Sequence, residues 1–179
     1  MTLDVAVLDW VVSIREPWLT DAVAVFTRTG GGVATSLIAA VVALLLVRAG
    51  RLRDAVFVAG AVFTGWPVMT LLKHLFGRVR PPEPERLLAL QTESFPSGHA
   101  MTSAILATVL VAVVVRTWPR GDRRRTVATA ALATYTLAIG LSRVYLAAHW
   151  LTDVAAGWIF GIAWALGWVW FVTRVRIRR

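Results

Sequence analysis

The sequence contains no cysteine and few charged residues for its length. Asp, Glu, Lys and Arg make up only 16% of the 179 residues, against roughly 25% in soluble domains. The absence of cysteine excludes disulfide bonds, a thiolate nucleophile and cysteine-ligated zinc. The shortage of charge, with a mean hydropathy of +0.68, indicates an integral membrane protein.

We expect no cleavable signal peptide, because the N-terminal residues include Asp4 and Asp9 where a signal peptide has a basic stretch. The net charge of +9 does not predict a nucleic-acid partner. The arginines stand in short turns between apolar segments, as the positive-inside rule describes. We therefore expect membrane lipids, and no nucleic acid, around this chain, and the sequence leaves its oligomeric state open.

Five apolar segments are long enough to cross a bilayer core of roughly 30 Å, which takes about 20 helical residues. They cover residues 31–48, 55–76, 98–115, 126–146 and 149–172. No linker divides the chain. We predict an all-α integral membrane helix bundle forming one membrane-embedded domain, residues 1–179, with the bundle at 30–172 and a basic cytoplasmic tail at 173–179.

Residues 1–29 are less apolar than the rest and contain four acidic residues. Their apolar residues recur at roughly helical spacing and are interrupted at Pro17. This pattern predicts two short amphipathic helices on the membrane surface, with a re-entrant hairpin as the alternative. The triplet Gly30-Gly31-Gly32 marks a break before the first span.

The distribution of arginine predicts the orientation. Arginines gather in the turns at 48–54 and 116–125 and in the C-terminal tail. With five spans these regions fall on one side, which we expect to be cytoplasmic. The N-terminus, the loop 77–97 and the turn near 147–149 then face the extracytoplasmic side of the plasma membrane.

Three polar clusters interrupt the apolar sequence, all on the predicted extracytoplasmic side. Ionisable groups within spans are energetically costly and usually functional, so their convergence on one face predicts a site. The clusters are Lys73 with Arg80-Pro81, then Pro96-Ser97-Gly98-His99, and then Ser142-Arg143 with His149 and Asp153.

The third cluster has the composition of a nucleophilic site. His149 and Asp153 are four residues apart at a helix start, so they share a face. The carboxylate can accept a hydrogen bond from Nδ1–H, which fixes the tautomer and leaves Nε2 free to attack. Arg143, in the preceding span, can bind phosphate through its planar fork. The alternative is an interfacial histidine paired with a capping aspartate.

The second cluster opens another predicted span. Ser97 can cap the helix, Gly98 lets a ligand approach the backbone, and His99 can act as a general acid. An ordinary helix start is the alternative.

The first cluster holds two cations two helical turns apart. Lys73 and Arg80 can both point at one anion, and the alternative is snorkelling at a membrane edge. We expect that structural role for the neighbouring His74 and Arg78. The charged residues of the loop 77–97 could shape substrate entry, but we favour a solvated loop for them: Glu83, Glu85, Arg86 and Glu93.

The spacing of the three clusters resembles a known family signature. It reads Lys73, six residues, Arg80-Pro81; then Pro96-Ser97-Gly98-His99; then Ser142-Arg143, five residues, His149, three residues, Asp153. This pattern resembles that of the type 2 phosphatidic acid phosphatase superfamily, which also includes vanadium haloperoxidases and glucose-6-phosphatase. Many bacterial members have a further span before the N-terminal region, and this chain is expected to lack it.

The resemblance implies a phosphatase that works through a phosphohistidine without a metal or other cofactor. It implies that His149 is the nucleophile, that Asp153 orients it, and that His99 protonates the leaving group. Because the two histidines then differ in protonation state, the resemblance also implies a bell-shaped dependence of the rate on pH. The remaining implied residues bind the phosphoryl group: Lys73, Arg80, Ser97, Gly98 and Arg143.

The resemblance leaves several functions open. A lipid phosphate or diphosphate is the expected substrate, with a polyprenyl diphosphate of cell-wall synthesis favoured. Phosphatidic acid and phosphatidylglycerol phosphate are alternatives, as is phosphotransfer to an acceptor other than water. An anion-binding or transport bundle is the non-enzyme alternative.

Overall fold

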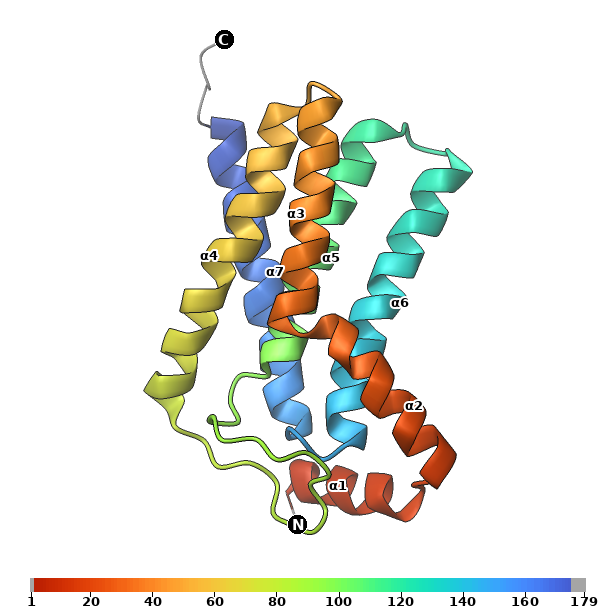
Figure 1. Ribbon diagram of the computed structural model, residues 1–179, viewed down its shortest axis with the longest axis vertical. Coiled ribbons are helices and arrows are strands. Elements are labelled where there is room, and N and C mark those ends of the chain that lie inside the picture. The colour runs from red at the N-terminus through yellow and green to blue at the C-terminus, as the bar shows by residue number, and fades with distance from the viewer. Residues whose placement is uncertain (1, 175–179) are drawn as a thin grey trace.

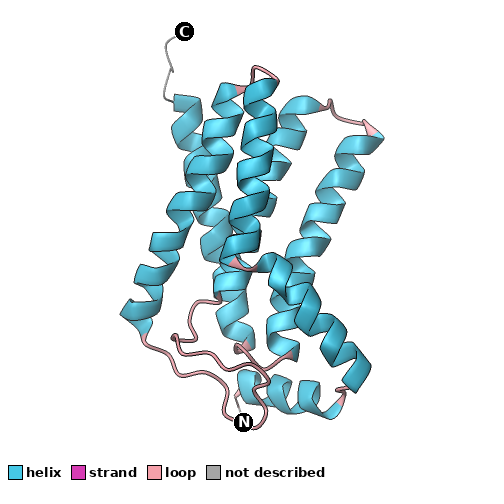
Figure 2. Ribbon diagram, viewed as in Figure 1, coloured by secondary structure: helices cyan, strands magenta, loops and turns pink. Residues whose placement is uncertain are grey.

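The computed structural model describes residues 2–174, and over this range the chain is all-α, as predicted (Figure 2). The last residues of the predicted basic tail, 175–179, lie outside the described range. The helices within it are α1 (Leu3–Ser13), α2 (Pro17–Thr27), the 3-10 helix η1 (Arg28–Gly30), α3 (Gly32–Arg48), α4 (Leu52–Phe76), α5 (Gly98–Thr117), α6 (Arg123–Tyr145) and α7 (Leu151–Arg174).

Four helices, α4 to α7, are each long and apolar enough to cross a membrane. Helix α3 has 17 residues, or about 26 Å at 1.5 Å per residue, which falls short of a bilayer core. The preceding segment Pro17–Gly30 meets it at a bend of 50°, and together they qualify as a fifth span. The bent pair is either one broken span or a re-entrant loop, so residues 2–174 contain four spans, or five if the pair crosses the membrane as one. The two short helices expected within residues 1–29 are present as α1 and α2.

The arginine-rich turns lie at one end of the bundle, as the arginine distribution predicts for five spans. In Figure 1 the α3–α4 turn, the α5–α6 turn and the end of α7 lie together at the top. Helix α1, the loop 77–97 and the α6–α7 turn lie together at the bottom, where α1 runs across the bundle end. All three polar clusters consequently belong to the lower half of the molecule in this view.

Helices α5 and α7 pack closely because α7 presents two glycines to α5. A Cβ at Gly157 would lie 2.7 Å from the backbone oxygen of Ser97, and one at Gly161 would lie 2.5 Å from that of Met101. Small residues at such a spacing let helix backbones approach in membrane proteins. The close contact brings the start of α7 beside the start of α5, where the second and third clusters lie.

Local sequence explains where the helices near the site begin and end. Helix α4 ends at Gly77, which adopts the left-handed conformation (φ 56°) that favours glycine at a helix C-terminus. Helix α5 begins after Ser97, whose hydroxyl accepts from the N–H of Ala100 over 3.4 Å. The loop 77–97 joins these two ends and crosses the bottom of the bundle.

Candidate active site

A cavity of about 190 Å³ lies where α4 and α5 meet the loop 77–97 and the α6–α7 turn. All three clusters contribute to its walls. The predicted site residues that line it are Lys73, Arg80, Gly98, His99, Arg143 and His149, and the other lining residues are Gly32, Trp66, Met69, Leu90, Thr92 and Thr102. The structure thus brings together predicted site residues that are up to 76 positions apart in sequence (73 to 149).

His149 stands in the α6–α7 turn and is 4% exposed. Its Nδ1 lies 3.6 Å from Oδ2 of Asp153, and its Nε2 lies 3.2 Å from Nη1 of Arg80. A guanidinium can only donate, so Nε2 is the acceptor and the ring proton belongs on Nδ1, facing Asp153. This is the tautomer that a nucleophilic Nε2 requires.

The electrostatic surroundings keep His149 neutral. Burial lowers the pKa of His149 to about 4. The cations Arg80, Arg143 and Lys73 also lower this pKa, and the neighbouring carboxylate of Asp153 acts in the opposite direction. The imidazole is therefore unprotonated at neutral pH, with a lone pair available on Nε2.

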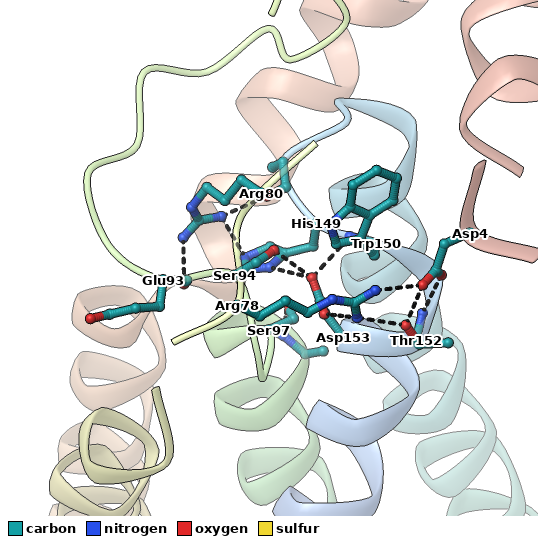
Figure 3. A network of polar contacts seen from close by, with 12 residues as sticks. Asp4, Arg78, Arg80, Glu93, Ser94, Ser97, His149, Trp150, Thr152 and Asp153 are labelled. Carbon is teal, nitrogen blue, oxygen red and sulfur yellow. Dashed lines mark hydrogen bonds and ion pairs between the residues drawn. The ribbon is translucent and has the colours of Figure 1, made fainter. Parts of the chain in front are cut away.

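Asp153 lies behind His149 and is completely buried. Its Oδ2 accepts from the hydroxyl of Ser94 over 2.5 Å and from the N–H of Trp150 over 3.0 Å. The second of these bonds caps the start of α7 from within, as the acidic residue of a capping box does. Figure 3 shows these groups converging on the carboxylate from the loop and the turn.

The three cations of the cavity are held by neutral partners. Lys73 Nζ donates to the carbonyl of Glu93 over 2.5 Å. Arg80 donates to the backbone oxygens of Thr92, Glu93 and Ala148, and to the Thr92 hydroxyl. Burial lowers the pKa of Arg80 to about 10, which leaves it charged at neutral pH.

Arg143 completes this set from α6. Its Nη1 donates to the hydroxyl of Thr27 over 3.1 Å, and its Nε is buried without a partner. Within residues 2–174, Lys73, Arg80 and Arg143 form no ion pair with a carboxylate. Buried cations without a counter-charge are costly, so this cavity suits an anion.

His99 and Ser97 differ in how they meet the cavity. His99 lines it, with Nε2 at 3.3 Å from where a Cβ on Gly31 would lie. Ser97 is buried and is not among the lining residues: its hydroxyl caps α5, and its N–H donates to the Asp153 carbonyl over 3.0 Å. Gly98 does line the cavity, and the first N–H groups of α5 have no intrahelical acceptor.

The expectation for Arg78 is wrong. Arg78 does not snorkel: its Nη1 donates to Oδ1 of Asp153 over 2.5 Å, and its Nη2 pairs with Asp4 at 2.7 Å. In the same loop Ser94 is fully buried against Asp153. None of the four charged loop residues expected to be solvated is buried. His74 does lie at the surface, where it pairs with Glu93 at 3.0 Å.

The sequence reasoning missed Ser94, Asp4 and Thr27, and no local motif marks them. Their partners lie 59, 74 and 116 positions away along the chain.

Among residues 2–174, no three His, Cys, Asp or Glu side chains lie together in a way that could hold a metal ion.

Comparison with known proteins decides the family. The family model of the PAP2 superfamily matches residues 54–177, which contain all three clusters. The chain belongs to the PAP2 superfamily. This membership confirms the resemblance drawn from the motifs and identifies the chain as a multi-pass membrane phosphatase, a hydrolase of lipid phosphate esters.

Relatives and solved structures agree with this assignment. The chain is 28% identical over 164 residues to phosphatidylglycerophosphatase B of Bacillus subtilis, a match covering 89% of this chain and 78% of the relative. Bovine glucose-6-phosphatase 3 is 43% identical over 77 residues, which cover 41% of this chain and 22% of that protein.

Two solved membrane proteins share the fold. The crystal structure of a PAP2-type phosphatidylglycerolphosphate phosphatase from Bacillus subtilis superposes with a TM-score of 0.78 at 27% identity, covering 98% of this chain and 87% of the other. That of Aquifex aeolicus LpxE gives a TM-score of 0.73 at 23% identity, covering 94% and 96%.

Proposed function

We propose that this protein hydrolyses a lipid phosphate or diphosphate through a phosphohistidine formed on His149. The observation that carries the proposal is a small cavity lined by two imidazoles, His149 and His99, and by three cations that form no ion pair with a carboxylate among residues 2–174. Its volume of about 190 Å³ is below the roughly 300–1,000 Å³ of pockets that enclose a whole drug-sized ligand. It suits a phosphoryl group whose attached chain stays outside.

In the proposed first step, Nε2 of His149 attacks phosphorus while the bond from phosphorus to the lipid oxygen breaks. His99 donates a proton to that departing oxygen. Asp153 stabilises the positive charge that develops on the imidazole. In the second step, water attacks the phosphohistidine, His99 takes the proton, and phosphate leaves with His149 restored.

The three cations stabilise the negative charge on the phosphoryl oxygens in both steps. Lys73, Arg80 and Arg143 approach the cavity from α4, the loop and α6, so they can contact different oxygens of one phosphoryl group. Fixed donors aimed at developing negative charge are commonly the largest contribution to catalysis. Gly98 can add the free N–H groups of the α5 N-terminus.

A groove in the bundle supports a substrate with a membrane-embedded chain. An apolar groove of about 450 Å³ runs between α3 and α4, and its lining residues include Gly32 and Trp66. The same two residues line the site cavity. An acyl or prenyl chain in this groove would have its phosphate at the cavity while the chain remains in the lipid.

Two lipid classes compete as the substrate. The two Bacillus subtilis proteins named above act, by their names, on phosphatidylglycerol phosphate, which favours a glycerolipid phosphate of this kind, with phosphatidic acid as its close alternative. A polyprenyl diphosphate fits a site on the extracytoplasmic side of the plasma membrane, the orientation that we infer from the arginines at the opposite end of the bundle. The site contacts phosphate, so its residues do not distinguish these chains.

Phosphate release by purified protein tests the proposal. The panel comprises phosphatidylglycerol phosphate, phosphatidic acid and undecaprenyl diphosphate, each with a chelator present, and includes the variant His149→Ala. Wild-type protein should release phosphate and the variant should not, while keeping its thermal stability. Brief exposure to ³²P-labelled substrate should label His149, and full phosphate release by His149→Ala would overturn the proposal. Transfer of label to added alcohols instead of water would indicate phosphotransfer.

A further inference from the structure

Asp4 in the first turn of α1 is bonded to the start of α7. Its Oδ1 accepts from the N–H of Thr152 over 3.0 Å, and its Oδ2 accepts from the Thr152 hydroxyl over 2.6 Å. The first N–H groups of a helix have no intrahelical acceptor, so Asp4 caps α7 from a distant part of the chain. Asp4 precedes the region 54–177 that matches the family.

Arg78 joins Asp4 to the carboxylate behind His149. Its Nη2 lies 2.7 Å from Oδ2 of Asp4, and its Nη1 lies 2.5 Å from Oδ1 of Asp153. Figure 3 shows the guanidinium between the two carboxylates, with Thr152 beside it. The planar fork of an arginine can hold two carboxylates at a fixed separation, so the position of α1 is transmitted to Asp153.

We propose that Asp4 and Arg78 are positioning residues for the reaction, in that Asp4 fixes Arg78 and Arg78 fixes Asp153 with Oδ2 turned toward Nδ1 of His149. This inference rests on the proposed role of His149 as the nucleophile. The different partners of the two carboxylate oxygens of Asp153 support this inference. Oδ1 is taken by Arg78, whereas Oδ2 is the oxygen that faces the imidazole.

The charges explain why a second carboxylate is useful. Arg78 alone would neutralise Asp153 and weaken its effect on His149. With Asp4 also bound, the Asp4–Arg78–Asp153 group keeps a net charge of −1. That charge stabilises the imidazolium character that develops as Nε2 bonds to phosphorus.

The protonation states agree with this arrangement. Partial burial raises the pKa of Asp4, but hydrogen bonds from Thr152 and Arg78 outweigh it and leave that pKa below its usual value. Burial likewise opposes the charge of Arg78, and the bonds to Asp4 and Asp153 raise its pKa overall. Asp4 and Arg78 are therefore both charged across the neutral range.

The test is the steady-state kinetics of Asp4→Asn and Arg78→Lys, with dioctanoyl phosphatidic acid in detergent micelles as substrate. Asparagine keeps the shape of Asp4 without its charge, and lysine lacks the fork that spans two carboxylates. We expect kcat to fall about tenfold in each, as when outer partners of site groups are removed, with KM unchanged. The double variant should lose no more than the worse single variant, since both act through one contact, and Asp4→Glu should restore most of the loss.

Asp54 provides a matched control at the far end of the bundle. The side chain of Asp54 is 14% exposed, against 11% for that of Asp4. Like Asp4, Asp54 is ion-paired with arginine, in its case with Arg51 and Arg116. Asp54→Asn should lower thermal stability and leave kcat unchanged. Full kcat in Asp4→Asn and Arg78→Lys, or an equal loss of kcat in Asp54→Asn, would overturn the inference. If Asp4→Asn is too unstable to purify, Arg78→Lys decides alone. Turnover by His149→Ala would instead refute the proposed function itself.

Discussion

Nη1 of Arg80 donates to Nε2 of His149 over 3.2 Å, so the proposed nucleophilic atom is hydrogen-bonded to a cation of its own site. A phosphoryl group that reaches Nε2 must replace this bond. Arg80 then exchanges the imidazole for a phosphoryl oxygen without leaving its backbone acceptors in the loop. The same residue therefore holds the imidazole before binding and the substrate afterwards.

Replacing Arg80 with lysine should separate charge from geometry. Arg80→Lys keeps the cation but loses the fork that contacts Thr92, Ala148 and His149. We expect kcat/KM for phosphate release to fall about 10²-fold, the loss typical of one missing donor to a transition-state oxyanion. Arg86→Lys is the control, since Arg86 pairs with the exposed Glu83 in the same loop. Equal losses in the two variants would contradict a specific role of Arg80.

The titration of His149 should lie far below that of an ordinary histidine. Its pKa is lowered to about 4, so the neutral ring predominates above that pH and nucleophilic activity is lost only as the pH falls through about 4. The acid side of the predicted bell-shaped profile should therefore lie near pH 4. Imidazole ¹⁵N chemical shifts of the free protein, assigned by comparison with His149→Ala, measure this directly. A midpoint near pH 6.5 would refute it.

Gly32 should control how long-chain substrates are used. A Cβ at this position would lie 2.3 Å from Nε1 of Trp66, so Gly32→Ala must displace the tryptophan that lines both groove and cavity. We expect kcat/KM for a long-chain lipid phosphate to fall about tenfold, as expected for a methylene-sized change in an apolar pocket. A water-soluble short-chain phosphate ester should be less affected, and equal losses for both substrates would argue against the groove.

The α5–α7 contact should be sensitive to a single methyl group. Gly161→Ala would bring a Cβ to 2.5 Å from the Met101 oxygen, and overpacking of this kind costs about 1–3 kcal/mol. Thermal unfolding in detergent should show a lower Tm. Gly167→Ala on the same helix meets open space and should leave Tm unchanged. A similar Tm for the two variants would show that α7 shifts freely.

Much of the helical framework could be predicted from sequence, because spans depend on local apolar length. The described spanning helices begin and end within three residues of the predicted bounds. The site cluster was also predictable, since the spacing of His149 and Asp153 puts them on one face of a helix start. In both cases the signal lies within a few turns of the chain.

The support around the site could not be predicted, because it depends on contacts between distant segments. Asp4, Ser94 and Arg78 meet Asp153 or one another only after the loop 77–97 and α1 fold across the bundle end. The bend between α2 and α3 was visible as a glycine triplet. The direction in which the chain runs on either side of the bend depends on the packing of α2 against α6 and of α3 against α5. A short stretch of sequence contains no information about such contacts.

The glycines at 157 and 161 and the aspartate at 153 follow one another at four-residue steps along α7. One added residue between Asp153 and Gly157 would rotate the start of the helix by about 100° against its packed face. The carboxylate would then turn away from the imidazole even though every side chain of the signature was retained. In this helix the count of residues is as constrained as their identity, so insertions and deletions should be tolerated only beyond its two ends.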